Sequence, residues 1–379
     1  METTSTAPAL KARYIMIGGF LGAGKTTSVL KLAHWLDDNL GLRVGLIDND
    51  QGSQLVDTAL LASQDFEVEE ISGGCFCCRF NSLVEAANRL TERTLPEVFI
   101  AEPVGSCTDL VATVTYPLRR MYGEDYTIAP LSVLVDPIRA ARVLGLEQGS
   151  RFSEKVEYIY RKQLEEADII VINKSDLLSP EKLDVLSKTL AEKYPLAKVM
   201  MISARTGEGL EEWFKELTET TQTPRAVMSV DYEVYADGEA LLGWLNAAYT
   251  LKTKTGVDAN ELLRQLAETV RRKLITAGGE VAHFKMTLEP EDGLGELAVL
   301  NLVRNDYVPE LSMELEEPFT DAHLTINMRA EAAPEALQSL LAEAVAETLA
   351  GFAGLTSTQE HLEAFRPGKP QPTHRDTTI

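Results

Sequence analysis

Three of the four cysteines in this 379-residue chain fall within four positions, as Cys75, Cys77 and Cys78 of the segment GGCFCC. Thiolates favour ions such as Zn²⁺, Co²⁺ and Cu⁺ over Mg²⁺, so the cluster indicates a transition-metal site. In an extended segment Cys75 and Cys77 point to one side and Cys78 to the other, and one ion can bind all three only if the chain turns sharply. We therefore expect Cys75 and Cys77 to be ligands, with Cys78 joining them in one switch state. Inert buried cysteines and redox-active thiols are the alternatives.

The segment GFLGAGKT, residues 19–26, fits the P-loop pattern G-x-x-x-x-G-K-[ST] between an expected strand and an expected helix. Its glycines allow backbone N–H groups to curl around phosphate oxygens at the positive end of the helix. Lys25 would then reach the β- and γ-phosphates, and the Thr26 hydroxyl would bind Mg²⁺. The residues expected to hold the nucleotide here are Gly22, Ala23, Gly24, Lys25, Thr26 and Thr27.

The segment NKSD, which follows another expected strand, carries the chemistry for recognising guanine. A carboxylate at Asp176 can accept from the N1–H and the exocyclic amine of guanine and would repel the N1 acceptor of adenine. Asn173 would serve the N7 and O6 side, and the Lys174 stem would cover the ring face. One strand later, Ser203 and Ala204 lie where a backbone N–H can donate to guanine O6. GTP and GDP are therefore the expected nucleotides.

The elements that position these motifs alternate along the chain from Tyr14 onward. The expected strands are YIMIGG, VGLID, EVFIAE, LSVLVD, DIIVINK and KVMMIS, and the expected helices begin near Thr26, Glu154, Pro180 and Gly209. Such alternation predicts right-handed βαβ crossovers and a mostly parallel sheet with helices on both faces. The predicted fold class is α/β, a P-loop NTPase domain over residues 1–217 with its core from about residue 13.

A smaller α+β domain is predicted after a linker at residues 218–226, TETTQTPRA, which have no apolar periodicity. Residues 227–352 combine a strand-like VMSVDYEVY, helical patterns near 238–249, 260–276 and 334–349, and the strand candidates VAHFKMTL, ELAVLNLV and AHLTIN. His283 is interpreted as an ordinary strand position. Residues 353–379 end in a polar, proline-rich run, and we expect a tail that is loose or draped on the surface.

The overall composition excludes some classes of function. A formal net charge of −22 with a pI near 4.7 argues against binding to nucleic-acid phosphates, which requires a basic surface. No apolar run is long enough for a signal peptide or a membrane span, so a cytoplasmic protein is expected. In that reducing compartment, clustered cysteines favour metal binding or thiol chemistry over disulfides.

With the P-loop, GGCFCC, the E-x-x-G of AEPVG and NKSD in this order, the chain resembles the CobW-like GTPases, relatives of the urease and hydrogenase nickel-insertion GTPases. The resemblance covers about residues 13–215. It implies a G domain that couples GTP hydrolysis to the handling of a transition metal. It also implies Lys25, Asp50 and Glu102 as catalytic residues, with Thr26, Asp50 and Glu102 around Mg²⁺.

The chain also departs from the family pattern. The family stretch N-E-F-G is replaced by NDQG at residues 49–52, and the histidine-rich loop of many members is missing. Cys107 lies two residues beyond Gly105, in the loop expected to respond to the γ-phosphate. It is a candidate for another metal ligand when GTP is bound, and a small buried hydrophobic side chain is the alternative.

Three functions are compatible with these motifs. The first is a GTP-hydrolysing metallochaperone or metal-insertion factor that holds Zn²⁺ or Co²⁺ on the Cys-x-Cys-Cys motif and releases it to a client metalloprotein. The second is a G-protein chaperone for a cobalamin-dependent (corrinoid) protein, and the third is a non-catalytic, GTP-responsive metal sensor or buffer. The C-terminal domain is expected to contact the client, and GTP-dependent homodimers are a further expectation.

Overall fold

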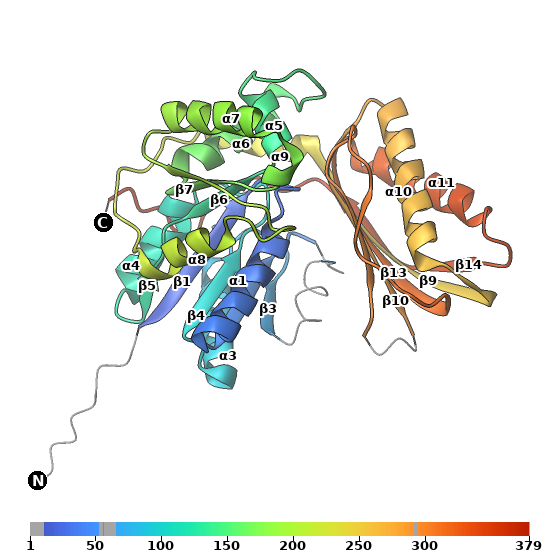
Figure 1. The fold of residues 1–379 in the computed structure, drawn as a ribbon, viewed down its shortest axis with the longest axis horizontal. Coiled ribbons are helices and arrows are strands. Elements are labelled where there is room, and N and C mark those ends of the chain that lie inside the picture. The colour runs from blue at the N-terminus through green and yellow to red at the C-terminus, as the bar shows by residue number, and fades with distance from the viewer. Residues whose placement is uncertain (1–10, 53–55, 57–65, 292–294, 379) are drawn as a thin grey trace, which may run out of the picture.

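The computed structural model of the chain describes residues 11–52, 56, 66–291 and 295–378. They build two sheets that lie beside each other in Figure 1. Among these residues, no helix is both long and apolar enough to cross a lipid bilayer.

The first sheet is parallel throughout, as the alternating pattern predicts, and its central strands follow the order β3-β2-β4-β1-β6-β7-β8, with β5 also paired to β1. Its strands are β1 (Ala12–Gly19), β2 (Val44–Asn49), β3 (Glu67–Ile71), β4 (Val98–Glu102), β5 (Tyr126–Ile128), β6 (Ser132–Val135), β7 (Ile169–Ile172) and β8 (Lys198–Met201). The six strands expected here are confirmed, and β3 and β5 are additional. The P-loop and NKSD both follow strands of this sheet, so they meet at its carboxyl edge.

Helices cover both faces of this sheet, which confirms the α/β class. Apolar side chains of α1 (Lys25–Leu40) and α8 (Leu210–Glu219) fill one core, and those of α3 (Phe80–Thr94), α6 (Glu154–Glu166) and α7 (Pro180–Lys193) fill the other. The remaining helical segments are a π-helical turn (Val111–Thr115), α4 (Tyr116–Tyr122), α5 (Pro137–Val143) and a 3₁₀ turn (Ser175–Leu177). All four helices expected in this domain are present.

Two expectations at the domain junction are wrong. The segment VMSVDYEVY is not a strand, because Asp231 caps α9 (Tyr232–Leu241) by accepting from the backbone N–H groups of Glu233 and Val234. Residues 242–249 are not helical but begin β9 (Leu242–Val257), in which residues 242–247 are all buried. Pairing with β13 on one side and β14 on the other makes them a strand, although their alanines and leucines suit a helix.

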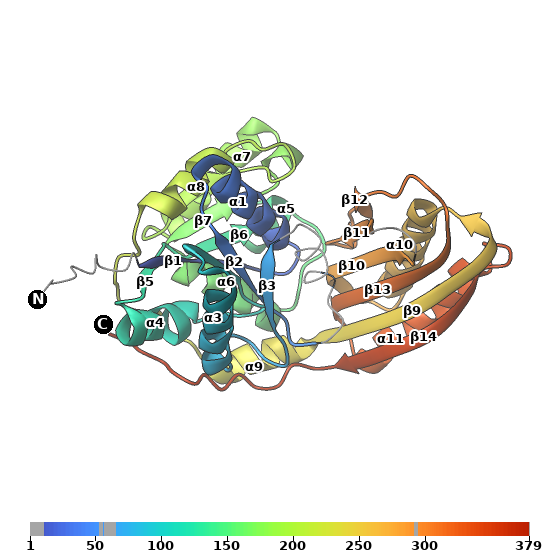
Figure 2. The same cartoon turned by 90° about the horizontal axis from the view of Figure 1, so that it is seen from below.

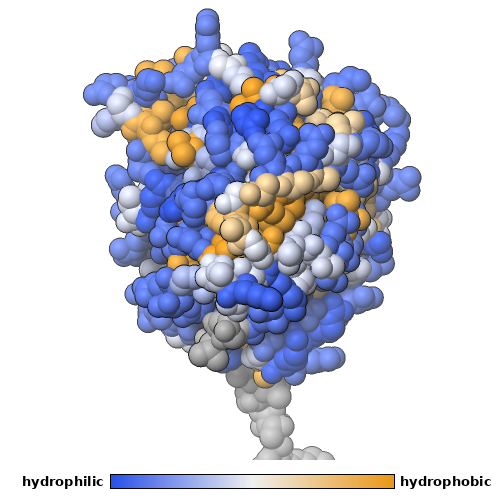
Figure 3. Space-filling view, turned by 90° about the vertical axis from the view of Figure 1, so that its right-hand side faces the viewer, coloured by the Kyte–Doolittle hydropathy of each residue, from blue (hydrophilic) through white to orange (hydrophobic). Residues whose placement is uncertain are grey.

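The second sheet is antiparallel, with the order β12-β11-β10-β13-β9-β14. Besides β9 it contains β10 (Glu280–Pro290), β11 (Ala298–Leu302), β12 (Glu310–Met313), β13 (Phe319–Glu331) and β14 (Thr356–Phe365). Its apolar face packs on α10 (Ala259–Thr276) and α11 (Pro334–Leu349), as expected for those helices. The opposite face is turned toward the first domain (Figure 2). The outer side of this domain is mostly hydrophilic, with smaller apolar groups (Figure 3).

The end of the chain was expected to be loose or draped on the surface over residues 353–379, and its first part differs from that expectation. Residues 356–365 form β14, nine of whose ten residues have register partners in β9. Residues 366–378 then run along the first domain, where the backbone N–H of Asp376 donates to Ala112 O at 2.8 Å. Pairing with β9 gives the backbone N–H and C=O groups of β14 hydrogen-bond partners, so this polar segment is ordered without a core of its own.

Candidate functional site

The P-loop takes the backbone shape that its glycines permit. Gly22 and Gly24 have φ angles of 78° and 88°, and Gly24 forms the left-handed N-cap of α1. Lys25 and Thr26 are buried, with Lys25 Nζ 3.6 Å from Glu102 Oε1. The Thr26 hydroxyl donates to the same carboxylate oxygen at 3.2 Å. The structure thus brings Lys25, Thr26 and Glu102 together at the start of α1.

The two segments predicted to recognise guanine lie against the P-loop. Asn173 donates its amide to Ala23 O at 2.9 Å and accepts from the backbone N–H of Ala204 at 3.1 Å. A side chain at Gly24 would lie 2.5 Å from the Asn173 amide nitrogen, so only glycine fits there. Asp176 accepts from the Ser203 hydroxyl at 2.6 Å. Asn173 therefore joins the two base loops to the phosphate loop, a bridging position that its motif did not predict.

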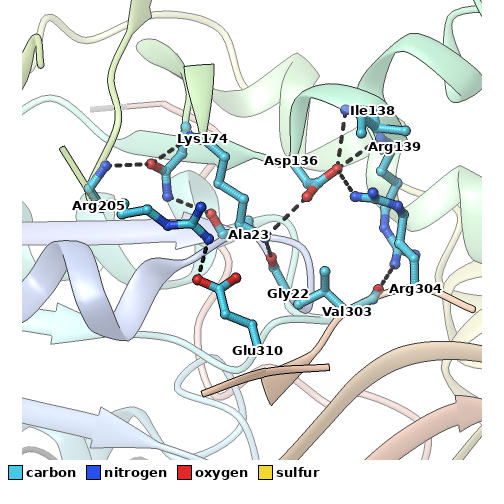
Figure 4. Close-up of polar contacts among 12 residues, drawn as sticks. Gly22, Ala23, Asp136, Ile138, Arg139, Lys174, Arg205, Val303, Arg304 and Glu310 are labelled. Carbon is cyan, nitrogen blue, oxygen red and sulfur yellow. Dashed lines mark hydrogen bonds and ion pairs between the residues drawn. The ribbon is translucent and has the colours of Figure 1, made fainter. Parts of the chain in front are cut away.

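Asp136, which directly follows β6, is a buried carboxylate with several polar partners that the sequence reasoning missed. It caps α5, accepts from Lys174 Nζ at 3.1 Å and pairs with Arg304 of the second domain at 2.7 Å (Figure 4). Burial opposes its charge, yet Lys174 and Arg304 together hold its pKa at about 2. The Asp-Pro pair after an apolar run was the available signal, because it is typical of a helix start.

A cavity of about 550 Å³ connects these segments, within the usual range for a small-molecule site. It is lined from the first domain by the P-loop, Asp48, Asp50, Glu102 and the two base loops. The second domain closes it with side chains from β9, β10, β11, β12 and β13. His283, expected at an ordinary strand position, lines this cavity. The candidate nucleotide site is therefore built by both domains.

The two acidic residues after β2 have different surroundings. Asp48 is buried and lies opposite Glu102 in the register of β2 and β4. Asp50, the residue expected near Mg²⁺ and the attacking water, accepts from Arg329 Nη2 at 3.0 and 3.1 Å. Arg329 is itself buried and lies 4.0 Å from the Trp244 ring. Asp50 is thus held by the second domain, and Asp48 is a further carboxylate of the cavity that sequence reasoning overlooked.

The cysteine segment turns sharply, so all three thiols meet. Gly73 and Gly74 have φ angles of 74° and 153°, and the backbone N–H of Cys78 donates to Cys75 O at 3.0 Å. The Sγ atoms of Cys75, Cys77 and Cys78 all lie within 4.8 Å of one another. Cys78 therefore stands with the other two here, where an extended segment would have placed it on the opposite side.

The pKa values of the thiols are shifted in opposite directions. Hydrogen bonds with Cys107, Cys77 and Cys78 lower the pKa of Cys75 well below its ordinary value. The hydrogen bond with Cys75 raises the pKa of Cys78 to about 11. Cys107 is buried and contacts Cys75 from outside the group of three. One thiolate already favoured at Cys75 is a suitable first ligand for a metal ion, which then displaces the remaining protons.

Two buried acidic side chains bind the residues on either side of Cys107. Glu239 of α9 accepts from the Ser106 hydroxyl at 2.6 Å, and burial followed by the charge of Cys75 raises its pKa well above the ordinary value. Glu166 accepts from the Thr108 hydroxyl at 3.0 Å, and burial followed by Asp109 raises its pKa to about 8. Sequence reasoning placed Glu239 in a helical pattern near residues 238–249 but did not identify it as a site residue, because its approach to the cysteines depends on the tertiary structure.

Asn49 connects the two candidate sites directly. It lies between Asp48 and Asp50, and its side-chain oxygen accepts from the backbone N–H of Phe76 at 2.9 Å. Its amide nitrogen donates to Ile71 O at 2.7 Å and to Gly74 O at 2.8 Å. Asn49, which lies between the cavity residues Asp48 and Asp50, therefore fixes the loop that carries the cysteines.

The polar end of the chain lies on the cysteine segment. The backbone N–H of Gln371 donates to Cys78 Sγ at 3.1 Å, and Thr373 donates from its backbone to Cys77 O and from its hydroxyl to Cys78 O. Arg375 anchors this end on the buried Asp109 at 2.7 Å. Access to the half-buried Cys78 is thus restricted by residues 366–378, called here the tail segment.

Removal of residues 367–379 should expose Cys78 to solvent reagents. The lost hydrogen bond to Cys78 Sγ contributes about 1 kcal/mol, so labelling of Cys78 by a maleimide is expected to accelerate by at least about fivefold. Peptide mapping of the labelled protein measures this rate, with the buried Cys107 as an internal control that should stay slow. Equal labelling rates for Cys78 in the full-length and shortened chains would contradict the prediction.

The sequence comparison agrees with this geometry over the first domain. Residues 13–201 match the CobW/HypB/UreG nucleotide-binding domain. This part of the chain belongs to that family. Among curated relatives, the zinc chaperone YeiR of Escherichia coli (strain K12) is 34% identical over 46% of this chain and 49% of its own length. The zinc chaperone CobW of Sinorhizobium sp is 30% identical over 54% of this chain and 62% of its own length. The chain thus spans about half to three fifths of these relatives.

The similarity of this chain to solved structures is more distant. Zn(II)-bound YjiA GTPase from E. coli is 18% identical, with a TM-score of 0.35 over 89% of this chain and 99% of that one. HypB from Helicobacter pylori in complex with nickel is 18% identical, with a TM-score of 0.40 over 56% of this chain and 91% of that one. At TM-scores below 0.5 these matches do not bear on the site.

Proposed function

We propose that the protein is a GTP-hydrolysing zinc chaperone, which holds Zn²⁺ on Cys75, Cys77 and Cys78 and releases it to a client metalloprotein. Its relatives in the CobW/HypB/UreG family include proteins named zinc chaperones. The observation that carries the proposal is Asn49, whose side chain ties the acidic end of β2 to the cysteine loop. Co²⁺ would fit the same thiolates, because it shares their preference for tetrahedral sulfur sites.

The phosphate end of the cavity suits a magnesium nucleotide. Mg²⁺ prefers oxygen ligands, and the Thr26 hydroxyl with the carboxylates of Asp48 and Glu102 supplies them from adjoining elements. When bound, Mg²⁺ would neutralise charge on the phosphates during hydrolysis. Lys25 binds the β- and γ-phosphates, and Glu102 or Asp50 orients the attacking water. Asp176 and the backbone of Ala204 select guanine.

Nucleotide and metal are coupled through two short segments. Hydrolysis releases the γ-phosphate from the residues around Glu102, and the loop that follows Glu102 carries Cys107, which contacts Cys75. A second connection runs from Asp48 and Asp50 through Asn49 to the cysteine loop. Because linkage is reciprocal, zinc must change GTP affinity by the same factor by which GTP changes zinc affinity.

Zinc affinity measured with a non-hydrolysable GTP analogue and with GDP tests this function. Allosteric coupling is typically 5- to 150-fold, so we expect a difference of at least about fivefold between the two nucleotides in the wild-type protein. Asn49→Ala should bring the ratio close to one, because it removes two hydrogen bonds to the cysteine loop and a third to the end of β3. The matched control is Asn39→Ala, since Asn39 is an exposed amide on α1 that donates to Trp35 O.

Equal zinc affinities with both nucleotides in the wild-type protein would refute the proposed switch. Coupling without any release of phosphate from GTP, even with zinc present, would favour the non-catalytic metal sensor. Coupling that survives Asn49→Ala unchanged would assign the connection to the loop after Glu102 instead.

A further inference from the structure

The inner face of the second sheet is polar and meets the P-loop. Along β10, Phe284, Met286 and Leu288 are buried in the core against the helices, while His283 and Lys285 line the cavity. This alternation follows from the strand period of two. The face that a sheet of this size normally leaves to water is therefore used here to complete the cavity.

Lys285 extends from the centre of that face to the magnesium end of the site. Its strand lies inside the sheet, with Asn301 and Asn327 as register partners on the two sides. Its Nζ donates to the Thr26 hydroxyl at 3.3 Å. Thr26 in turn donates to Glu102, next to Lys25. A cation from the second domain therefore touches the hydroxyl that is expected to bind Mg²⁺.

Close packing between the P-loop and the second sheet fixes the position of Lys285. A side-chain carbon at Gly22 would lie 3.0 Å from Val303 Cβ and 3.1 Å from Ala282 O, so the P-loop and the second sheet are in direct contact. The Arg304–Asp136 ion pair, with both side chains buried, joins the same two parts (Figure 4). Lys285 is thus held near the P-loop by packed backbone and not only by its flexible stem.

We propose that Lys285 binds the γ-phosphate of GTP and makes the second domain distinguish GTP from GDP. The inference rests on the proposed nucleotide function. The Thr26 hydroxyl would hold the Mg²⁺ of a magnesium nucleotide, and an ammonium within hydrogen-bond distance of that hydroxyl would then lie within reach of the terminal phosphate. An ammonium has three donors and no acceptor, which suits a phosphate oxygen. GDP has no γ-phosphate, so with GDP bound Lys285 on β10 would lack this contact.

The test compares nucleotide affinity in the full-length wild-type protein and in Lys285→Ala and Lys285→Arg, by calorimetry with Mg²⁺ and either a non-hydrolysable GTP analogue or GDP. A hydrogen bond to a charged group supports an expected 10- to 100-fold loss of analogue affinity in Lys285→Ala, with GDP affinity changed less than about threefold. Lys285→Arg should retain most of the affinity because it keeps the charge. Lys252→Ala is the matched control, since Lys252 lies exposed on the same sheet, paired with Asp321.

The possible outcomes separate the two proposals. Selective loss of analogue affinity in Lys285→Ala supports the inference. Equal losses for the analogue and GDP, or no change for either, overturn it while leaving GTP binding in place. A wild-type protein that binds neither nucleotide overturns the proposed function and the inference together.

Discussion

Replacing Cys75 by serine is expected to lower the zinc affinity of the protein by about 100- to 1,000-fold. Structural zinc sites in small domains are worth about 10–16 kcal/mol over four ligands, which gives roughly 3–4 kcal/mol for each ligand. Cys75 lies 2.8 Å from Cys77 and 3.4 Å from Cys78 between the Sγ atoms, and it is the thiol with the lowered pKa. Its loss removes the ligand that needs least energy to ionise. Competition with a chromophoric zinc chelator measures the change.

Cys107→Ser is the matched control for this experiment. Cys107 contacts Cys75 and is equally buried, but it lies outside the group of three sulfurs. Its replacement should cost about tenfold in zinc affinity, the lower end of the 10- to 100-fold range for side chains that support metal ligands. A loss as large as that of Cys75→Ser would make Cys107 a fourth ligand, and no loss in either variant would refute the metal site.

Lys25→Ala should reduce the rate of GTP hydrolysis by about 100- to 1,000-fold, the usual effect of removing one donor that stabilises charge in a transition state. Lys25 is buried at the first position of α1 and lies 3.6 Å from Glu102. Release of phosphate under saturating GTP gives the rate, and thermal unfolding shows whether the variant is folded.

Lys31→Ala controls for the loss of one positive charge on the same helix. Lys31 also lines the cavity but is exposed. We expect its hydrolysis rate to stay within about threefold of wild type, because exposed charges interact weakly through water. A similar rate loss in both variants would mean that general electrostatics, and not the P-loop lysine, controls turnover.

The parts of the site that could be predicted are those encoded in adjacent residues. GFLGAGKT and NKSD each combine a strand end with the backbone geometry and side chains of one contact, and the parallel sheet then brings strand ends to a common edge. The turn at the cysteines was foreseeable as well, since Gly73 and Gly74 adopt the positive φ angles that glycine permits. Residues 242–249 could not be decided locally, because alanine and leucine suit a helix while pairing with β13 and β14 requires a strand.

By itself the sequence determined the P-loop, the guanine-recognition segment, the clustered thiols and the α/β order of the first domain, all of which depend on short-range patterns. Only the tertiary structure decided that Lys285 and Arg329 face the phosphate end, that Asp136 pairs with Arg304, and that the tail segment lies on Cys78. These contacts join residues more than 150 positions apart in the chain. Their partners are chosen by how two sheets pack against each other, and that packing is a property of the whole buried surface and not of any local pattern.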